Sequence, residues 1–107
     1  MKRYGSVIKV DLDKLEEYKR LHANPWPEIN EKIKECNINN YSIYYNEGYL
    51  FSYFEYVGNN YETDMEKMAA DPITQKWWDL CKPCQIPLQT RQEGEWWADM
   101  EEVYHLD

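Results

Sequence analysis

The chain has 107 residues, 43% of them hydrophobic, and a formal net charge of −8 at neutral pH. This length suits one domain over residues 1–107 with a single core. The acidic balance disfavours binding to nucleic acid or to an anionic membrane surface, because both select basic patches. No Gly-rich phosphate loop is present, so a neutral ligand suits the chain better than a phosphorylated one.

The first residues lack the apolar run of a signal peptide, and no segment is apolar enough to span a bilayer. The cysteine count is three, which cannot form a complete disulfide framework. We therefore expect a cytoplasmic protein with reduced thiols. Aromatic residues make up 16% of the chain, and Tyr and Trp are common in interfaces and ligand pockets.

The first third of the chain favours a strand followed by two helices. Residues 4–10 are rich in β-branched side chains, which favour a strand. Asp11 or Asp13 is placed to cap the helix that follows. Pro25 and Pro27 end that helix, and Pro27 suits the first turn of a second one.

The middle of the chain favours a β-hairpin. Residues 39–45 and 49–57 form its expected strands, joined by a turn in which Gly48 suits a left-handed backbone. Bulky side chains occur on both faces, whereas a sheet with one wet face alternates apolar and polar residues. Both faces are therefore expected to be covered. Helices cover one face, and a second subunit is the simplest cover for the other.

The last third favours a helix over 61–70 and another that starts at Asp71-Pro72, with Asp71 as its N-cap. A long loop over 83–95 and a final strand over 97–106 complete the chain. The resulting order, βαββαβ, is the ferredoxin-like pattern of an α+β fold.

Tyr18 and His22 form the first candidate site. Their spacing of four places both side chains on one face of the first helix, one turn apart. A phenol and an imidazole so paired supply a hydrogen-bond donor and a proton carrier that titrates near neutral pH. The alternative is a half-buried structural histidine. The proline-broken segment beside it favours the functional interpretation, because clefts form where helices stop.

Trp77 and Trp78 are neighbours on the last helix and are therefore about 100° apart around its axis. One is expected in the core, and the other is free to stack on a sugar ring or to close a pocket. A structural role for both is the alternative. Glu101 and Glu102 are expected on a solvated strand face, and one inward carboxylate there is a candidate partner for His22.

Residues 81–84 have C-x-x-C spacing, but the motif follows a helix and enters a loop. A redox dithiol instead follows a strand and opens a helix. A structural zinc site needs about four ligands, and Cys36, His22 and His105 are not grouped with the motif by spacing. We therefore expect neither a metal nor a redox role.

Taken together, these residues resemble the L-rhamnose mutarotase family. The resemblance runs from end to end of the chain and rests on the order and spacing of its parts. The matching parts are Glu17-Tyr18 with His22, Trp26-Pro27-Glu28, Asn40-Tyr41 with Ile43-Tyr44, Trp77-Trp78, and Glu102-Val103-Tyr104 with Leu106. The sequence departs from the family's pattern in two places: Asn24-Pro25 is displaced by one position, and the stretch 81–97 is atypical.

The resemblance implies a dimeric ferredoxin-like α+β fold of the dimeric α/β-barrel type, with no cofactor and no metal. It implies that His22 is the proton donor and that Tyr18, Tyr41, Trp77 and Trp78 contact the sugar. The implied reaction interconverts the α and β anomers of a 6-deoxy-L-sugar by acid–base ring opening and closure. L-rhamnose is the first candidate, and L-fucose stays open.

Other interpretations fit the same sequence. Tyr18, Tyr41 or an inward carboxylate are candidates for the base that opposes the acid. A cofactor-free monooxygenase on the same dimeric fold, acting on an aromatic substrate, is an alternative function. A non-enzymatic dimeric interaction module is another. Anomer exchange, oxygen uptake and concentration-dependent association would distinguish these three.

Overall fold

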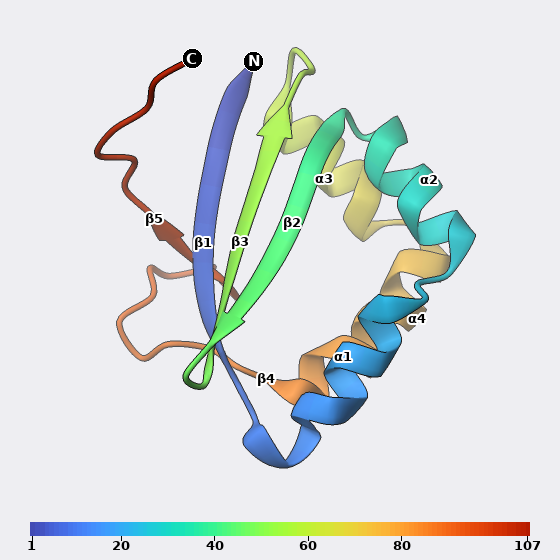
Figure 1. Cartoon of the computed structure of the whole chain (residues 1–107). Helices are drawn as coiled ribbons and strands as arrows, with labels where there is room; N and C mark the ends of the chain where they lie inside the picture. The colour runs from blue at the N-terminus through green and yellow to red at the C-terminus, as the bar shows by residue number, and fades with distance from the viewer.

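Figure 1 shows the computed structural model of residues 1–107, a curled antiparallel sheet with helices on one face. The strands are β1 (Lys2–Val10), β2 (Ile38–Asn46), β3 (Tyr49–Tyr56), β4 (Gln85–Ile86) and β5 (Ala98–Met100). The helices are α1 (Leu15–Ala23), α2 (Pro27–Glu35), α3 (Tyr61–Ala69) and α4 (Pro72–Cys81), with 3-10 turns at Leu12–Lys14 and Lys82–Cys84. The expected α+β fold is confirmed, and no helix is long and apolar enough to cross a membrane.

The strand order is β2-β3-β1, with β4 and β5 both paired to the free edge of β1. β1 is therefore the central strand, and the last strand of the ferredoxin-like pattern is split into two short pieces. β4 pairs with the end of β1 at Lys9 and Val10, and β5 pairs with its middle. The hairpin of β2 and β3 turns at Gly48, whose φ is +88°.

Two expectations for the end of the chain are wrong. The final strand covers Ala98–Met100 rather than 97–106, and the expected loop over 83–95 contains a 3-10 turn and β4. After Met100 the backbone no longer pairs with β1. The Glu102 carboxylate instead accepts a hydrogen bond from the Arg3 guanidinium at 2.9 Å. Residues 101–106 therefore have no partner strand in the sheet.

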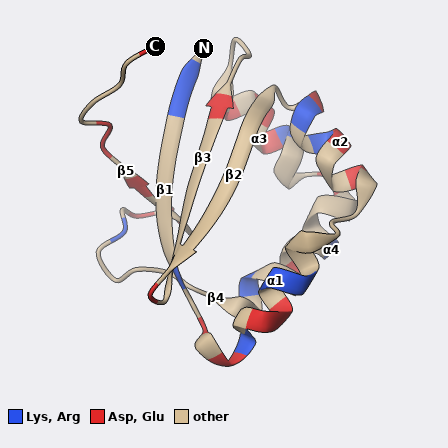
Figure 2. Ribbon diagram, in the orientation of Figure 1, with Lys and Arg blue, Asp and Glu red and all other residues tan.

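The sheet has an inner face toward the helices and an outer face away from them. Alternation along β1 and β3 sends Ser6, Ile8, Leu50 and Ser52 to the inner face, where all four are buried. The Ser6 and Ser52 hydroxyls lie 2.5 Å apart and satisfy each other in the middle of the sheet. Figure 2 shows that charged residues lie mainly on the helices and the strand ends. The sheet interior therefore stays uncharged on its inner side.

The buried core connects the inner face to three helices. Its members are Ile8, Val10, Tyr18, Ile29, Leu50, Trp77, Cys81 and Cys84. Two of the members that α1 and α4 contribute, Tyr18 and Trp77, are also candidate site residues. The packing that stabilises the fold therefore also positions the site.

The start of α4 confirms the expected N-cap. The Asp71 carboxylate accepts from the Thr74 backbone N–H at 2.9 Å and from the Thr74 hydroxyl at 2.8 Å, and Pro72 occupies the first turn. These hydrogen bonds hold the pKa of Asp71 below its ordinary value. The cap sets where α4 begins, and hence which way Trp77 points.

We expect Asp71→Ala to lower the free energy of unfolding by ~1 kcal/mol, because an N-cap bond is lost and its donors face water instead. Urea denaturation followed by circular dichroism measures this. Asp79→Ala, which removes an exposed carboxylate from the same helix, is the matched control and should change stability by less than half as much. Equal losses in both variants would contradict the capping role.

Candidate active site

α1 brings Tyr18 and His22 together on its inner side, as their spacing predicts. The two rings stack with centroids 4.1 Å apart and an interplanar angle of 25°. His22 Nδ1 lies 2.9 Å from the Tyr18 carbonyl oxygen. A carbonyl only accepts, so Nδ1 carries a proton in this contact, and Nε2 is the nitrogen left for a ligand.

His22 is half-buried, and its burial has an electrostatic effect. Burial lowers the pKa of His22 from its ordinary value near 6.5, and the hydrogen bond to the Tyr18 carbonyl opposes that shift in part. The imidazole is therefore neutral at neutral pH, with the Nε2 lone pair free. A neutral imidazole in this state is ready to accept a proton.

Tyr18 is only 3% exposed. Burial raises its pKa well above the ordinary value for a phenol, although a hydrogen bond from Gln85 opposes the rise. The Gln85 amide nitrogen lies 3.2 Å from the Tyr18 hydroxyl oxygen. Tyr18 therefore stays protonated across the physiological range and acts as a hydrogen-bond donor rather than a base.

Tyr41 reaches the inner face through a β-bulge. The register of β2 and β3 shifts between Asn39 and Ser42, and Asn40 has a φ of +51°. The bulge re-aims the next side chain, so that the Tyr41 ring meets Phe54 edge-on at 5.5 Å between centroids. Tyr41 is 43% exposed on this face, which indicates water-accessible space between the sheet and the helices.

Although the Tyr41 ring is partly exposed, its hydroxyl is removed from bulk water. Burial raises its pKa to about 12, and the neighbouring Cys81 thiol and Tyr61 phenol add to the rise. Tyr41 is thus a second donor, and the two phenols proposed from sequence as bases are poorly suited to that role.

Trp77 and Trp78 separate as their spacing predicts. Trp77 is 6% exposed and presents its edge to His22 at 5.4 Å and to Trp26 at 5.3 Å between ring centroids. Trp78 is partly exposed, and the Lys82 ammonium lies 5.0 Å from its ring centroid. Trp77 is therefore the core tryptophan, and it touches the imidazole as well.

A hollow of about 290 Å³ opens beside the Tyr18 and His22 pair. Its lining is mostly apolar and comprises Leu15, Tyr18, Lys19, His22, Ala23, Ile43, Tyr45 and Leu50. A larger hollow of about 620 Å³ lies among polar residues of the segment 89–96. The smaller hollow is the better candidate for chemistry because it contains the imidazole and apolar walls.

Several residues behave differently from the sequence interpretation. Glu101 and Glu102 are exposed and do not pair with His22, because Glu102 bonds to Arg3 and the strand ends at Met100. Gln85 was missed altogether. Nothing in its local sequence marks it, since its contact to Tyr18 spans 67 positions.

The cysteines of the C-x-x-C motif are buried and free. Burial raises the pKa of Cys81 to about 12 and raises that of Cys84 as well. A buried thiol of this kind is a poor nucleophile and a poor metal ligand, because both roles need the thiolate. The structure contains no group of three or more His, Cys, Asp or Glu side chains placed to hold a metal ion.

Comparison with known proteins gives a consistent result over the whole chain. Residues 3–106 match the family model described as L-rhamnose mutarotase. The L-rhamnose mutarotase of Bacillus subtilis is 37% identical over 110 residues, and that of Oceanobacillus iheyensis is 35% identical over 109 residues. Both alignments cover 100% of this chain and 100% of the relative.

Two solved structures share the fold. An L-rhamnose mutarotase from Formosa agariphila superposes with a TM-score of 0.77 at 22% identity, covering 100% of both chains. Tetracenomycin F2 cyclase from Streptomyces glaucescens, a type-II polyketide cyclase, superposes with a TM-score of 0.73 at 13% identity. That alignment covers 100% of this chain and 98% of the cyclase. At these identities the two structures establish the fold alone, the dimeric α/β-barrel type.

The site geometry makes a direct prediction about His22. We expect its imidazole to titrate below pH 6.5, because burial disfavours the charged ring. The chain has two histidines, so His105→Asn leaves a single imidazole signal for proton NMR titration. A midpoint at or above 6.5 would contradict the burial argument.

The same shift has a consequence for stability. A folded-state pKa below the unfolded value means that the unfolded chain binds more protons as the pH falls below about 6.5. The contribution of His22 to stability is therefore complete above that pH and is lost as the pH falls through that region.

Proposed function

The chain belongs to the L-rhamnose mutarotase family, and we propose that it interconverts the α and β anomers of L-rhamnose in the hollow beside His22. As a member of that family it is a mutarotase, an isomerase. The observation that carries the assignment to this hollow is the contact between Tyr18 and His22. Their rings stack, and His22 Nδ1 is hydrogen-bonded to the Tyr18 carbonyl one helical turn away. A neutral, polar sugar suits a site with an imidazole, protonated phenols and apolar walls.

The chemistry needs only proton transfer. When a cyclic hemiacetal opens, the anomeric hydroxyl loses its proton, the bond from the anomeric carbon to the ring oxygen breaks, and the ring oxygen gains a proton. Rotation about the bond to the resulting aldehyde carbon, followed by closure, gives the other anomer. Each well-placed acid or base contributes typically ~10²–10⁴-fold to such a step.

We assign the proton transfer to His22 Nε2. The anomeric hydroxyl and the ring oxygen are bonded to the same carbon, so one imidazole nitrogen reaches both. Nε2 takes the proton from the anomeric hydroxyl and donates it to the ring oxygen, and the reverse order closes the ring. The lowered pKa of His22 favours this cycle because the resting imidazole is neutral.

The phenols have a supporting role in this proposal. Tyr18 and Tyr41 remain protonated at neutral pH, so each donates a hydrogen bond to a sugar oxygen. A donor near the ring oxygen stabilises the negative charge that develops as its bond to carbon breaks. Trp77 presents flat apolar surface beside the imidazole for the carbon side of the ring, whereas Trp78 packs against Lys82.

We expect His22→Ala to reduce anomer exchange about 10²-fold or more, since the proton carrier is gone. Tyr18→Phe should reduce it only about fivefold, because one neutral hydrogen bond is lost and the ring stays. Saturation-transfer NMR between the two anomeric proton signals measures exchange, with L-rhamnose and L-fucose tested side by side. In the wild-type protein, exchange should fall as the pH drops through the His22 pKa, because the imidazolium cannot accept a proton.

Thermal melts by circular dichroism are the folding control for both variants. Exchange close to the wild-type rate in a folded His22→Ala protein would remove His22 from the mechanism. Faster exchange of L-fucose than of L-rhamnose would keep the mechanism and change the substrate. Oxygen uptake with an aromatic substrate, without anomer exchange, would support the monooxygenase alternative.

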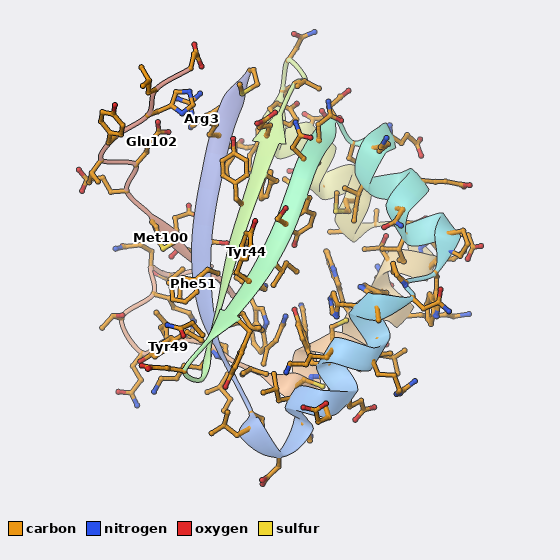
Figure 3. The ribbon with its side chains drawn as sticks, in the orientation of Figure 1. Arg3, Tyr44, Tyr49, Phe51, Met100 and Glu102 are labelled. Carbon is orange, nitrogen blue, oxygen red and sulfur yellow. The ribbon has the colours of Figure 1, made fainter.

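We also propose that the protein is a homodimer joined through the outer face of the sheet. The side chains labelled in Figure 3 occur on this side, and several are large and uncovered: Tyr44 is 67% exposed, Met100 42% and Tyr49 37%. Phe51 lies among them, opposite Tyr44 in the register. Contiguous exposed apolar surface of this kind marks an interaction site, and the resemblance to the family implies a dimer.

Sedimentation equilibrium should show a dimer at micromolar concentration. Phe51→Asp should shift the protein toward monomer, because a buried unpaired carboxylate is costly in an apolar interface. Ala69→Asp, on the exposed end of α3, adds the same charge away from this face and should leave the dimer intact. A wild-type monomer at that concentration, or equal dissociation of both variants, would contradict the proposal.

A further inference from the structure

We propose that Gln85 is a positioning residue for the sugar reaction, holding the Tyr18 hydroxyl so that its hydrogen points toward the substrate. The role rests on the proposed function, in which Tyr18 donates to a sugar oxygen. Gln85 lies in β4 opposite Val10 in the register, so its side chain shares the inner face with Val10. From there it reaches the hydroxyl of Tyr18 on α1.

The orientation of the Gln85 amide is fixed by its other neighbour. The Trp96 indole nitrogen lies 2.8 Å from Gln85 Oε1. An indole N–H only donates, so the amide atom facing Trp96 must be the oxygen. The NH₂ group is thereby left to face Tyr18, which it does at 3.2 Å. Trp96 thus decides which end of the amide meets the phenol.

This orientation sets the direction of the Tyr18 hydrogen bond. The phenol oxygen accepts from Gln85, so the phenol hydrogen has no partner on that side and is available to the site. Accepting this bond also makes the phenol a better donor, because it opposes the rise in pKa that burial causes. The three groups form a chain of donors that runs from Trp96 through Gln85 to Tyr18.

The segment that carries Trp96 is also attached to Trp78. The Lys82 ammonium lies 5.0 Å from the Trp78 ring centroid and 5.3 Å from that of Trp96. Cation–π contacts of this kind hold the indole of Trp96 in place. Gln85, Lys82 and Trp96 all fall within the stretch 81–97. This stretch therefore provides the contacts that hold Gln85 against the Tyr18 hydroxyl.

A double-mutant cycle tests the assignment. Gln85→Leu removes the amide and should lower kcat about fivefold, the usual effect of one neutral hydrogen bond. In the Tyr18→Phe background the same substitution should change kcat by less than twofold, because the hydroxyl through which Gln85 acts is absent. KM should change less than kcat in the first case. Equal losses in both backgrounds would overturn the role of Gln85.

Gln85→Glu reverses the bond without changing the size of the side chain. A carboxylate accepts from Trp96 and also from Tyr18, so it turns the phenol hydrogen away from the sugar. The ratio of its exchange rate to the wild-type rate should be low at neutral pH and rise as the introduced carboxylate is protonated. A ratio that does not vary with pH would count against the proposal.

Gln89→Glu is the matched control, since it adds the same charge at an exposed position four residues along the chain, without contacting Tyr18. Its ratio to the wild-type rate should stay near one at every pH. A wild-type protein that exchanges neither sugar would overturn the proposed function and this inference with it. An active wild-type protein with equal losses in the two backgrounds would overturn this inference alone.

Discussion

The contact on which the site depends is the hydrogen bond between His22 Nδ1 and the Tyr18 carbonyl, together with the stacking of the two rings. It joins the proton carrier to the backbone of its own helix, so the imidazole moves only if α1 moves. α1 in turn is held by the burial of Tyr18 in the core. A single buried phenol therefore stabilises the helix, orients the imidazole and presents a donor.

Short-range patterns predicted most of this arrangement. The spacing of Tyr18 and His22 put both on one helix face, and the pair Trp77-Trp78 divided into a core and a more exposed residue because of helix geometry. The capping of α4 by Asp71 could also be predicted from the sequence, because the cap and its partner Thr74 are three residues apart. Contacts between residues three or four positions apart in a helix follow from their spacing and can be predicted from the sequence.

The features that the sequence did not predict depend on contacts between residues far apart in the chain. Gln85 meets Tyr18 across 67 positions, so no local pattern could reveal it. The final strand was predicted over 97–106 and covers only Ala98–Met100. Pairing ends where β1 and the chain diverge, which only the tertiary structure shows. Glu101 and Glu102 are exposed as expected, and the candidate pairing of one of them with His22 does not occur, because Glu102 meets Arg3 instead.

The position of β1 at the centre of the sheet has a consequence for how the chain folds. β1 is the first strand in the sequence, yet its neighbours are β3 on one edge and β4 and β5 on the other, up to the contact of Gly5 with Met100. Each pairing closes a long loop, and such topologies fold slowly compared with helical bundles. During synthesis the central strand therefore stays unpaired on one edge until β4 and β5 have been made. Until they arrive, one edge of β1 has unpaired backbone groups, which exposes the nascent chain to strand-mediated aggregation.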